Sequence, residues 1–184
     1  MATLTSEERA HLTERLEQSR DLFLRSIDGL TPAQWAFKPS EEEWSVGECS
    51  DHVLFIENLT FGLVTEKIFR RPAEPEKAAE VAGKERKLER AVPDRSTKVK
   101  MPIKAEPTGC AECPETLAAA FQDARQKTLD YVVTTDKPLH HHFAPHMIFK
   151  DLDGAQWLLM MALHAERHVH QIEEVKANPA YPSA

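Results

Sequence analysis

The sequence predicts an all-α fold, a four-helix bundle with a long crossover connection between its second and third helices. Four long segments repeat apolar residues every three or four positions, the spacing that places them on one face of a helix. Residues 71–114 separate the second segment from the third and contain six of the twelve prolines. We find no convincing strand, and 184 residues fit one domain, so residues 1–184 are expected to form a single bundle.

The first long helix is expected over residues 6–28. Thr5 and Glu8 are typical of a capping box, in which each side chain bonds the backbone N–H of the other residue. Gly29 is expected to end the helix because glycine tolerates the left-handed backbone conformation. Thr31, which is followed by proline, predicts a second helix start and a single turn.

The second long helix is expected over residues 46–70, with Ser45 and Glu48 as another capping box. Its spacing predicts a buried face made of Cys49, His52, Val53, Ile56, Leu59 and Leu63. The crossover over residues 71–114 carries nearly balanced charge, so we expect it to bury little surface. A solvated helix can form within it over residues 76–90, weakened at Gly83.

The last two long helices have equally clear boundaries. Pro114 opens the third, which ends before Pro138. Asp153 and Gln156 are expected to cap the fourth, which runs to about Lys176. The buried face of the third helix is expected to hold Leu117, Phe121, Ala124, Thr128 and Tyr131 or Val132.

Composition excludes several classes of protein. The 23 Lys and Arg against 30 Asp and Glu give a formal charge of −7, which is unsuited to nucleic-acid binding. The longest apolar run, Trp157 to Leu163, is far shorter than the roughly 20 residues that span a bilayer. The first residues do not resemble a signal peptide, and three cysteines do not make a disulfide framework. We therefore expect a cytoplasmic protein with neither a membrane nor a nucleic acid as partner.

Histidines interrupt the buried faces of two helices. His164 and His168 are one turn apart in the fourth helix, so both imidazoles can reach one metal ion at about 2.0–2.1 Å. His52 lies on the buried side of the second helix and can face this pair across the core. Three imidazoles with a free coordination position are typical of a catalytic metal site. The alternative is three ordinary core histidines, which is the commoner case for a lone residue such as His52.

Four further residues on the two helices that carry these histidines have expected roles. Gln171 shares their face and either orients a metal ligand or bonds another helix. His170 lies about 200° around the helix from His168 and is expected to face solvent. Asp51 is expected to be a surface charge, and Trp157 a core residue rather than a platform for substrate.

Two further groups carry weaker signals. Cys110 and Cys113, before the third helix, form either a redox pair or two thiols in a loop. His140, His141 and His142 form either a weak metal site or a solvated loop, and the solvated loop is the commoner case.

Two motifs resemble the DinB-like family, a damage-inducible family of four-helix bundles. They are WSVGE from Trp44, followed by Asp51 and His52, and HAERHVHQI from His164 to Ile172. The resemblance covers nearly the whole chain, although residues 71–114 follow no pattern of the family that we identify. It implies a metal-binding triad of one histidine on the second helix and two on the fourth, here His52, His164 and His168.

The resemblance also implies an activity. Some members transfer low-molecular-weight thiols such as bacillithiol, mycothiol or glutathione, with a divalent metal (Zn²⁺, Ni²⁺ or Fe²⁺) holding the thiol as thiolate. Others are described as metal-dependent hydrolases, in which the metal acidifies a water molecule. A third reading is a metal-binding or stress-response module without turnover. No general base is evident beside the triad, which favours thiol transfer to a small electrophilic substrate. The oligomeric state stays open, and a homodimer is one alternative.

Overall fold

The structure, a computed structural model, describes residues 3–96 and 113–183. Within these residues seven α-helices dominate and two short strands form one hairpin, which confirms the predicted all-α fold. The elements in chain order are α1 (Ser6–Ile27), α2 (Pro32–Ala36), α3 (Val46–Gly62), α4 (Ala78–Val81), α5 (Lys84–Ala91), α6 (Pro114–Thr134), β1 (Phe143–His146), β2 (Lys150–Asp153) and α7 (Gly154–Lys176). None of the helices in these residues is both long and apolar enough to cross a membrane.

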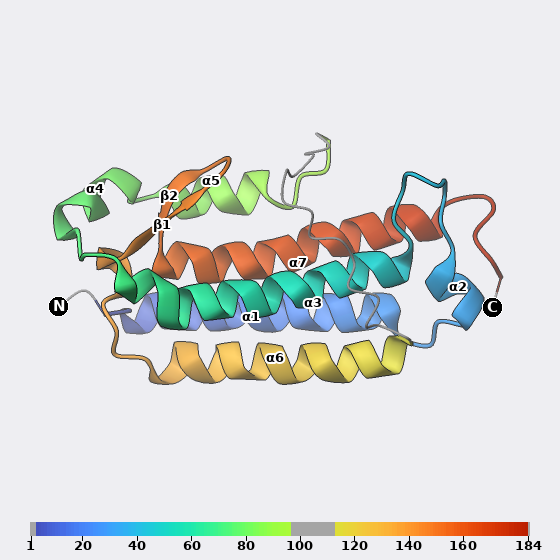
Figure 1. Cartoon of the computed structure of the whole chain (residues 1–184), viewed down its shortest axis with the longest axis horizontal. Helices are drawn as coiled ribbons and strands as arrows, with labels where there is room; N and C mark the ends of the chain where they lie inside the picture. The colour runs from blue at the N-terminus through green and yellow to red at the C-terminus, as the bar shows by residue number, and fades with distance from the viewer. Residues whose placement is uncertain (1–2, 97–112, 184) are drawn as a thin grey trace.

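The four long helices α1, α3, α6 and α7 lie side by side as a bundle (Figure 1). Helix α7 packs against α1 and α3, and α6 packs against the same two helices, so α6 and α7 occupy opposite corners. Side chains on facing sides of α3 and α7 therefore meet inside the bundle. Helix α5 packs on the outer side of α7.

The predicted helix starts and stops are confirmed. Glycine 29 has φ of +66°, the left-handed conformation expected just beyond the end of α1. Capping boxes are present at the starts of α1, α2, α3 and α7, where the side chains of Thr5, Thr31, Ser45 and Asp153 each accept a backbone N–H bond.

Helix α2 is held against the start of α3 by a close approach. A Cβ atom on Gly47 would lie 2.7 Å from the indole nitrogen of Trp35, a distance that side-chain carbons do not tolerate. The glycine within the WSVGE motif therefore lets Trp35 pack directly onto the first turn of α3. This packing anchors both ends of the loop that carries Trp44.

The buried face of α3 differs from the predicted one in its second half. The helical path does continue to Arg70, through a π-helical turn and a 3₁₀ turn. Leu59, however, is 41% exposed, whereas Glu57 and Thr60 are buried. The predicted burial of Leu59 was wrong because Glu57 points inward and pairs with Arg125 of α6. This contact sets the rotation of α3 about its axis, so that Leu59 lies on the solvent-facing side.

The crossover buries more surface than its composition predicts. Val81, Leu88 and Val92 are buried, and Leu88 belongs to the main core cluster. Gly83 interrupts the helical path as expected, with φ of +80°. The expectation of a wholly solvated segment was therefore wrong for α4 and α5, because apolar residues on one face of each pack onto the bundle.

The hairpin of β1 and β2 was not predicted. The strands pair antiparallel, from Phe143 opposite Asp153 to His146 opposite Lys150, and lead directly into α7. Each strand has four residues and β1 contains Pro145, so the sequence holds no alternating pattern long enough to indicate strands.

A buried ion pair joins α6 to α3 and α1. Arg125 Nε and Nη2 donate to the two carboxylate oxygens of Glu57 at 2.7 and 2.8 Å. Arg125 Nη1 donates to the Leu16 carbonyl and the Ser19 hydroxyl, and Thr128 donates to Glu57. Both side chains of the pair are fully buried, so these bonds replace the water that each charge has lost.

Replacing Arg125 with methionine is expected to lower the free energy of unfolding by about 3–5 kcal/mol, because Glu57 would remain buried without its cation. The double variant Arg125→Met, Glu57→Gln should lose less, since the buried charge is removed as well. Urea denaturation of the three proteins measures both values. A double variant that is less stable than Arg125→Met would contradict this account.

His140 lies between two carboxylates rather than in a solvated loop. Its Nδ1 lies 2.9 Å from Asp153 Oδ2 and its Nε2 lies 3.3 Å from Glu8 Oε1. The hydrogen bond to Asp153 and the charges of both carboxylates raise the pKa of His140 to about 9, against partial desolvation. The prediction of a solvated loop was therefore wrong for this residue, which ties the start of α7 to the start of α1.

The His140 interaction should make stability depend on pH. Because the pKa rises from about 6.5 to about 9 on folding, the stabilisation is complete below pH 6.5 and is lost as the pH rises through 9. His140→Gln is expected to cost up to about 3 kcal/mol at pH 6 and little at pH 10. Thermal or urea unfolding at both pH values measures this, with His141→Gln as the control. A His140→Gln cost that is equal at the two pH values would refute the assignment.

Candidate metal centre

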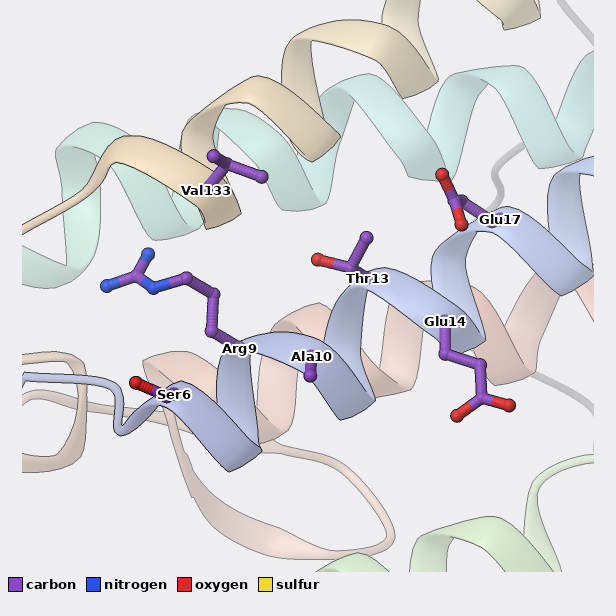
Figure 2. Close-up of a pocket in the computed structure, with 7 residues that line it drawn as sticks. All are labelled: Ser6, Arg9, Ala10, Thr13, Glu14, Glu17 and Val133. Atoms are coloured by element: carbon purple, nitrogen blue, oxygen red, sulfur yellow. The ribbon is translucent and has the colours of Figure 1, made fainter.

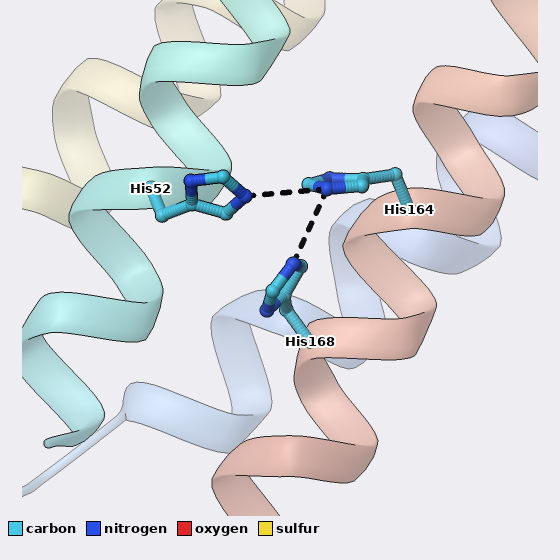
Figure 3. Close-up of side chains that lie close together, drawn as sticks. All are labelled: His52, His164 and His168. Atoms are coloured by element: carbon cyan, nitrogen blue, oxygen red, sulfur yellow. Dashed lines mark hydrogen bonds between the residues drawn. The ribbon is translucent and has the colours of Figure 1, made fainter. Parts of the chain in front are cut away.

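Three histidine rings converge between α3 and α7. His52 comes from the second turn of α3, and His164 and His168 come from successive turns of α7, with their rings directed at one another (Figure 3). The Nε2 atom of His164 lies 3.3 Å from Nε2 of His52 and 3.2 Å from Nε2 of His168. The structure thus brings together the three histidines that the sequence singled out.

The spacing of these nitrogens fits a metal ion. Two ligands at about 2.0–2.1 Å from a tetrahedral metal are separated by about 3.3–3.4 Å, close to the two distances observed here. One nitrogen from each of the three rings lies within 4.8 Å of the others. The group could therefore bind a metal through three imidazoles, which leaves a fourth position for another ligand.

Burial favours the form of histidine that binds metals. Desolvation, followed by the charge of His52, lowers the pKa of His164 to about 3. Desolvation, followed by the charge of His164, lowers the pKa of His168 well below its usual value. Both rings are therefore neutral at physiological pH, and a neutral imidazole has a lone pair to share.

Hydrogen bonds alone satisfy this cluster poorly. Gln171 Oε1 lies 3.0 Å from His168 Nδ1 and can only accept, so the proton of His168 is on Nδ1 and its Nε2 carries a lone pair. His164 Nε2 faces both that atom and His52 Nε2, yet a ring nitrogen offers either one proton or one lone pair. A cation accepts lone pairs from all three rings at once, so the donor set fits a metal better than it fits a proton network.

Trp44 covers one side of the cluster, a role that sequence analysis missed. Its ring centroid lies 4.9 Å from that of His52 and 6.1 Å from that of His168, to which it is nearly parallel. The residue stands just before the cap of α3, and its place in the WSVGE motif was the only signal in the sequence. His164, by contrast, is only partly buried, so the centre can be approached from its side.

Arg95 is the second residue that sequence analysis missed. It follows α5 in the crossover and donates through Nη1 to Gln171 Oε1 at 3.2 Å. Nothing in the proline-rich sequence around it indicates this contact, because the path of the crossover over α7 is a property of the tertiary structure.

The other predicted neighbours have mixed outcomes. Gln171 contacts His168, as expected from the interpretation in which it orients a histidine of the cluster. His170 is exposed and faces away from the cluster, near the Pro93 carbonyl, as predicted. Trp157 donates to the carbonyl of Ala144, which supports a packing role. The prediction that Asp51 is a surface charge was wrong, because this residue is buried in the first turns of α3.

The cysteines offer no ligand to the histidine cluster in the described residues. Cys49 is buried, which raises the pKa of its thiol to about 12, so it behaves as the small apolar residue that was predicted. Cys113 precedes α6, and its sulfur lies 3.1 Å from the hydroxyl of Thr116. Cys110 lies outside the described residues, so the redox pair stays a prediction.

One surface hollow lies elsewhere on the bundle. It has a volume of about 450 Å³ and lies between α1 and the end of α6, with Arg9, Glu14 and Val133 among the residues that line it (Figure 2). Its lining contains neither histidine nor cysteine, and it opens widely to solvent. The hollow therefore takes no part in the histidine cluster.

The protein is a helical bundle in which three histidine nitrogens from two helices converge in a group that could hold a metal ion. The chain belongs to the DinB superfamily, which matches residues 15–172, so the family predicted from the two motifs is confirmed. It is similar to the Bacillus subtilis (strain 168) protein named "Uncharacterized protein YuaE", with 26% identity over 152 residues. That match covers 82% of this chain and 88% of the relative. No solved structure gives a significant match.

Replacing one cluster histidine should abolish stoichiometric metal binding, whereas replacing its solvent-facing neighbour should not. We expect His168→Ala to lose bound metal and His170→Ala to retain it, because only the first ring faces the cluster. Metal analysis of the purified, untagged proteins gives the stoichiometry. Equal loss in the two variants would contradict the assignment of the helix faces.

Proposed function

We propose that this protein is a divalent-metal-dependent enzyme that transfers a low-molecular-weight thiol to a small electrophile. Its metal ligands are His52, His164 and His168. The observation that carries the proposal is the convergence of their three Nε2 atoms at the spacing of metal ligands. Zn²⁺, Ni²⁺ and Fe²⁺ all accept imidazole nitrogen, so the donor set is compatible with each of them.

When bound, the metal supplies positive charge that favours the thiolate form of a thiol at neutral pH. The chain holds His164 and His168 uncharged by burial, and Gln171 sets the proton position of His168. Trp44 covers one side of the cluster, while His164, a residue of intermediate burial, lies toward the side from which substrate would approach.

The chemistry of the neighbours favours thiol transfer over hydrolysis. In the described part of the chain, the hydrogen-bonding partners of His164 and His168 are histidine and glutamine side chains rather than carboxylates. Attack by water normally uses a general base, whereas a thiolate that has already lost its proton to solvent needs none. The thiolate sulfur forms a bond to the electrophilic carbon. The bond between that carbon and the leaving group breaks, and the leaving group departs with its electron pair.

The activity can be tested on metal-loaded protein with a panel of thiols and a haloalkyl electrophile. We expect thiol conjugation above the uncatalysed rate in the wild type and a fall to background in His164→Ala. His170→Ala, which changes a ring that faces away from the cluster, is the matched control. Chromatography of the conjugate measures the rate. Ester hydrolysis without conjugation would favour a hydrolase, and metal binding without any turnover would favour a binding module.

A further inference from the structure

Arg95 joins the crossover to the helix that carries two of the cluster histidines. Its Nε and Nη2 donate to the two carboxylate oxygens of Glu174 at 2.8 and 2.7 Å, and its Nη1 donates to Gln171 Oε1. Only 14% of the side chain is exposed, although it belongs to a segment rich in charge and proline. A bidentate contact of this kind fixes the orientation of the guanidinium as well as its position.

The backbone just before Arg95 is also held against α7. Arg167 donates to the carbonyls of Val92 and Asp94, and His170 Nδ1 lies 3.2 Å from the carbonyl of Pro93. These contacts do not involve the side chain of Arg95. The segment therefore has anchors of its own, which should keep it in place when that side chain is replaced.

Arg95 determines which end of the Gln171 amide faces the cluster. A glutamine amide has an oxygen at one end and an NH₂ at the other, and rotation by half a turn exchanges them. A guanidinium can only donate, so it requires the oxygen, and the same oxygen faces His168 Nδ1. With the amide reversed, its NH₂ would donate to Nδ1, and the proton of the neutral ring would move to Nε2, where it would block metal binding.

We propose that Arg95 is a positioning residue of the metal centre. By fixing the Gln171 amide it selects the form of His168 that presents a lone pair at Nε2. The proposal rests on the metal centre within the proposed function, and it does not depend on thiol chemistry. It assigns a role in metal binding to the crossover, a segment that lies outside the four long helices.

The direction of the change in Zn²⁺ affinity distinguishes a loss of ligand orientation from a loss of positive charge. Loss of a positive charge near a cation site favours cation binding through Coulomb's law alone. Loss of an interaction that orients a metal ligand weakens binding, by about 10–100-fold in known metal sites. A fall in affinity when Arg95 is neutralised therefore cannot come from the change in charge.

The first test compares Zn²⁺ affinity by competition with a chromophoric chelator, using the full chain. Arg95→Met is expected to weaken binding about tenfold and to change the visible absorption of the Co²⁺-substituted protein. Arg95→Lys keeps a group that only donates but loses the bidentate contact with Glu174, so its Zn²⁺ affinity should lie between those of Arg95→Met and the wild type. Arg90→Met, at an exposed position of α5, is the matched control and should bind as the wild type does.

The second test uses a variant in which the side chain at position 171 accepts the His168 proton in either orientation. Gln171→Glu places a carboxylate beside His168, and either of its oxygens accepts the Nδ1 proton. In that background Arg95→Met should leave Zn²⁺ affinity unchanged or raise it. An equal loss of affinity in both backgrounds would show that Arg95 acts through packing and would overturn the proposal. Unchanged affinity in Arg95→Met with Gln171 present would overturn it as well.

These outcomes are distinct from a failure of the proposed function. A wild type that binds Zn²⁺ but conjugates no thiol refutes the enzymatic activity, while the effect of Arg95 on affinity stands. Zn²⁺ binding that is insensitive to Arg95 refutes only the positioning role. A wild type that binds neither Zn²⁺ nor Co²⁺ refutes both.

Discussion

Burial of three imidazoles at one point between α3 and α7 is the constraint on which the rest of the site depends. Desolvation penalises the charged ring, which keeps His164 and His168 neutral. Neutral rings packed nitrogen to nitrogen are in turn poorly satisfied by the few protons they share. The bundle therefore maintains in its interior a polar cluster that could hold a metal ion.

A second polar contact fixes the rotation of α3, so that this cluster can form. His52 and Glu57 both face the interior, the first toward α7 and the second toward Arg125 of α6. A buried carboxylate without its cation is strongly destabilising, so α3 cannot turn about its axis without losing that contact. The rotation that keeps Glu57 paired also keeps His52 directed at His164, and it leaves Leu59 on the outer surface.

Several segments outside the four long helices lie around α7. Helix α5 and the hairpin of β1 and β2 pack on its outer side, and Trp44 reaches the cluster from the loop that precedes α3. Arg95 reaches α7 from the crossover that follows α5. Two of the groups that surround the histidines are thus supplied by connections, while the long helices supply the three histidines. This division is common in sites where a rigid scaffold holds the reactive groups and loops shape their surroundings.

The sequence by itself determined the features that depend on short-range bonds. Helix starts, the turn at Gly29 and the pairing of His164 with His168 follow from contacts within four residues along the chain, which spacing reveals. The tertiary structure alone decided the meeting of His52 with that pair, the burial of Asp51 and the contacts of Arg95. The rotation of α3 depends on an ion pair between residues 68 positions apart, and no local pattern specifies which distant partner a side chain will meet.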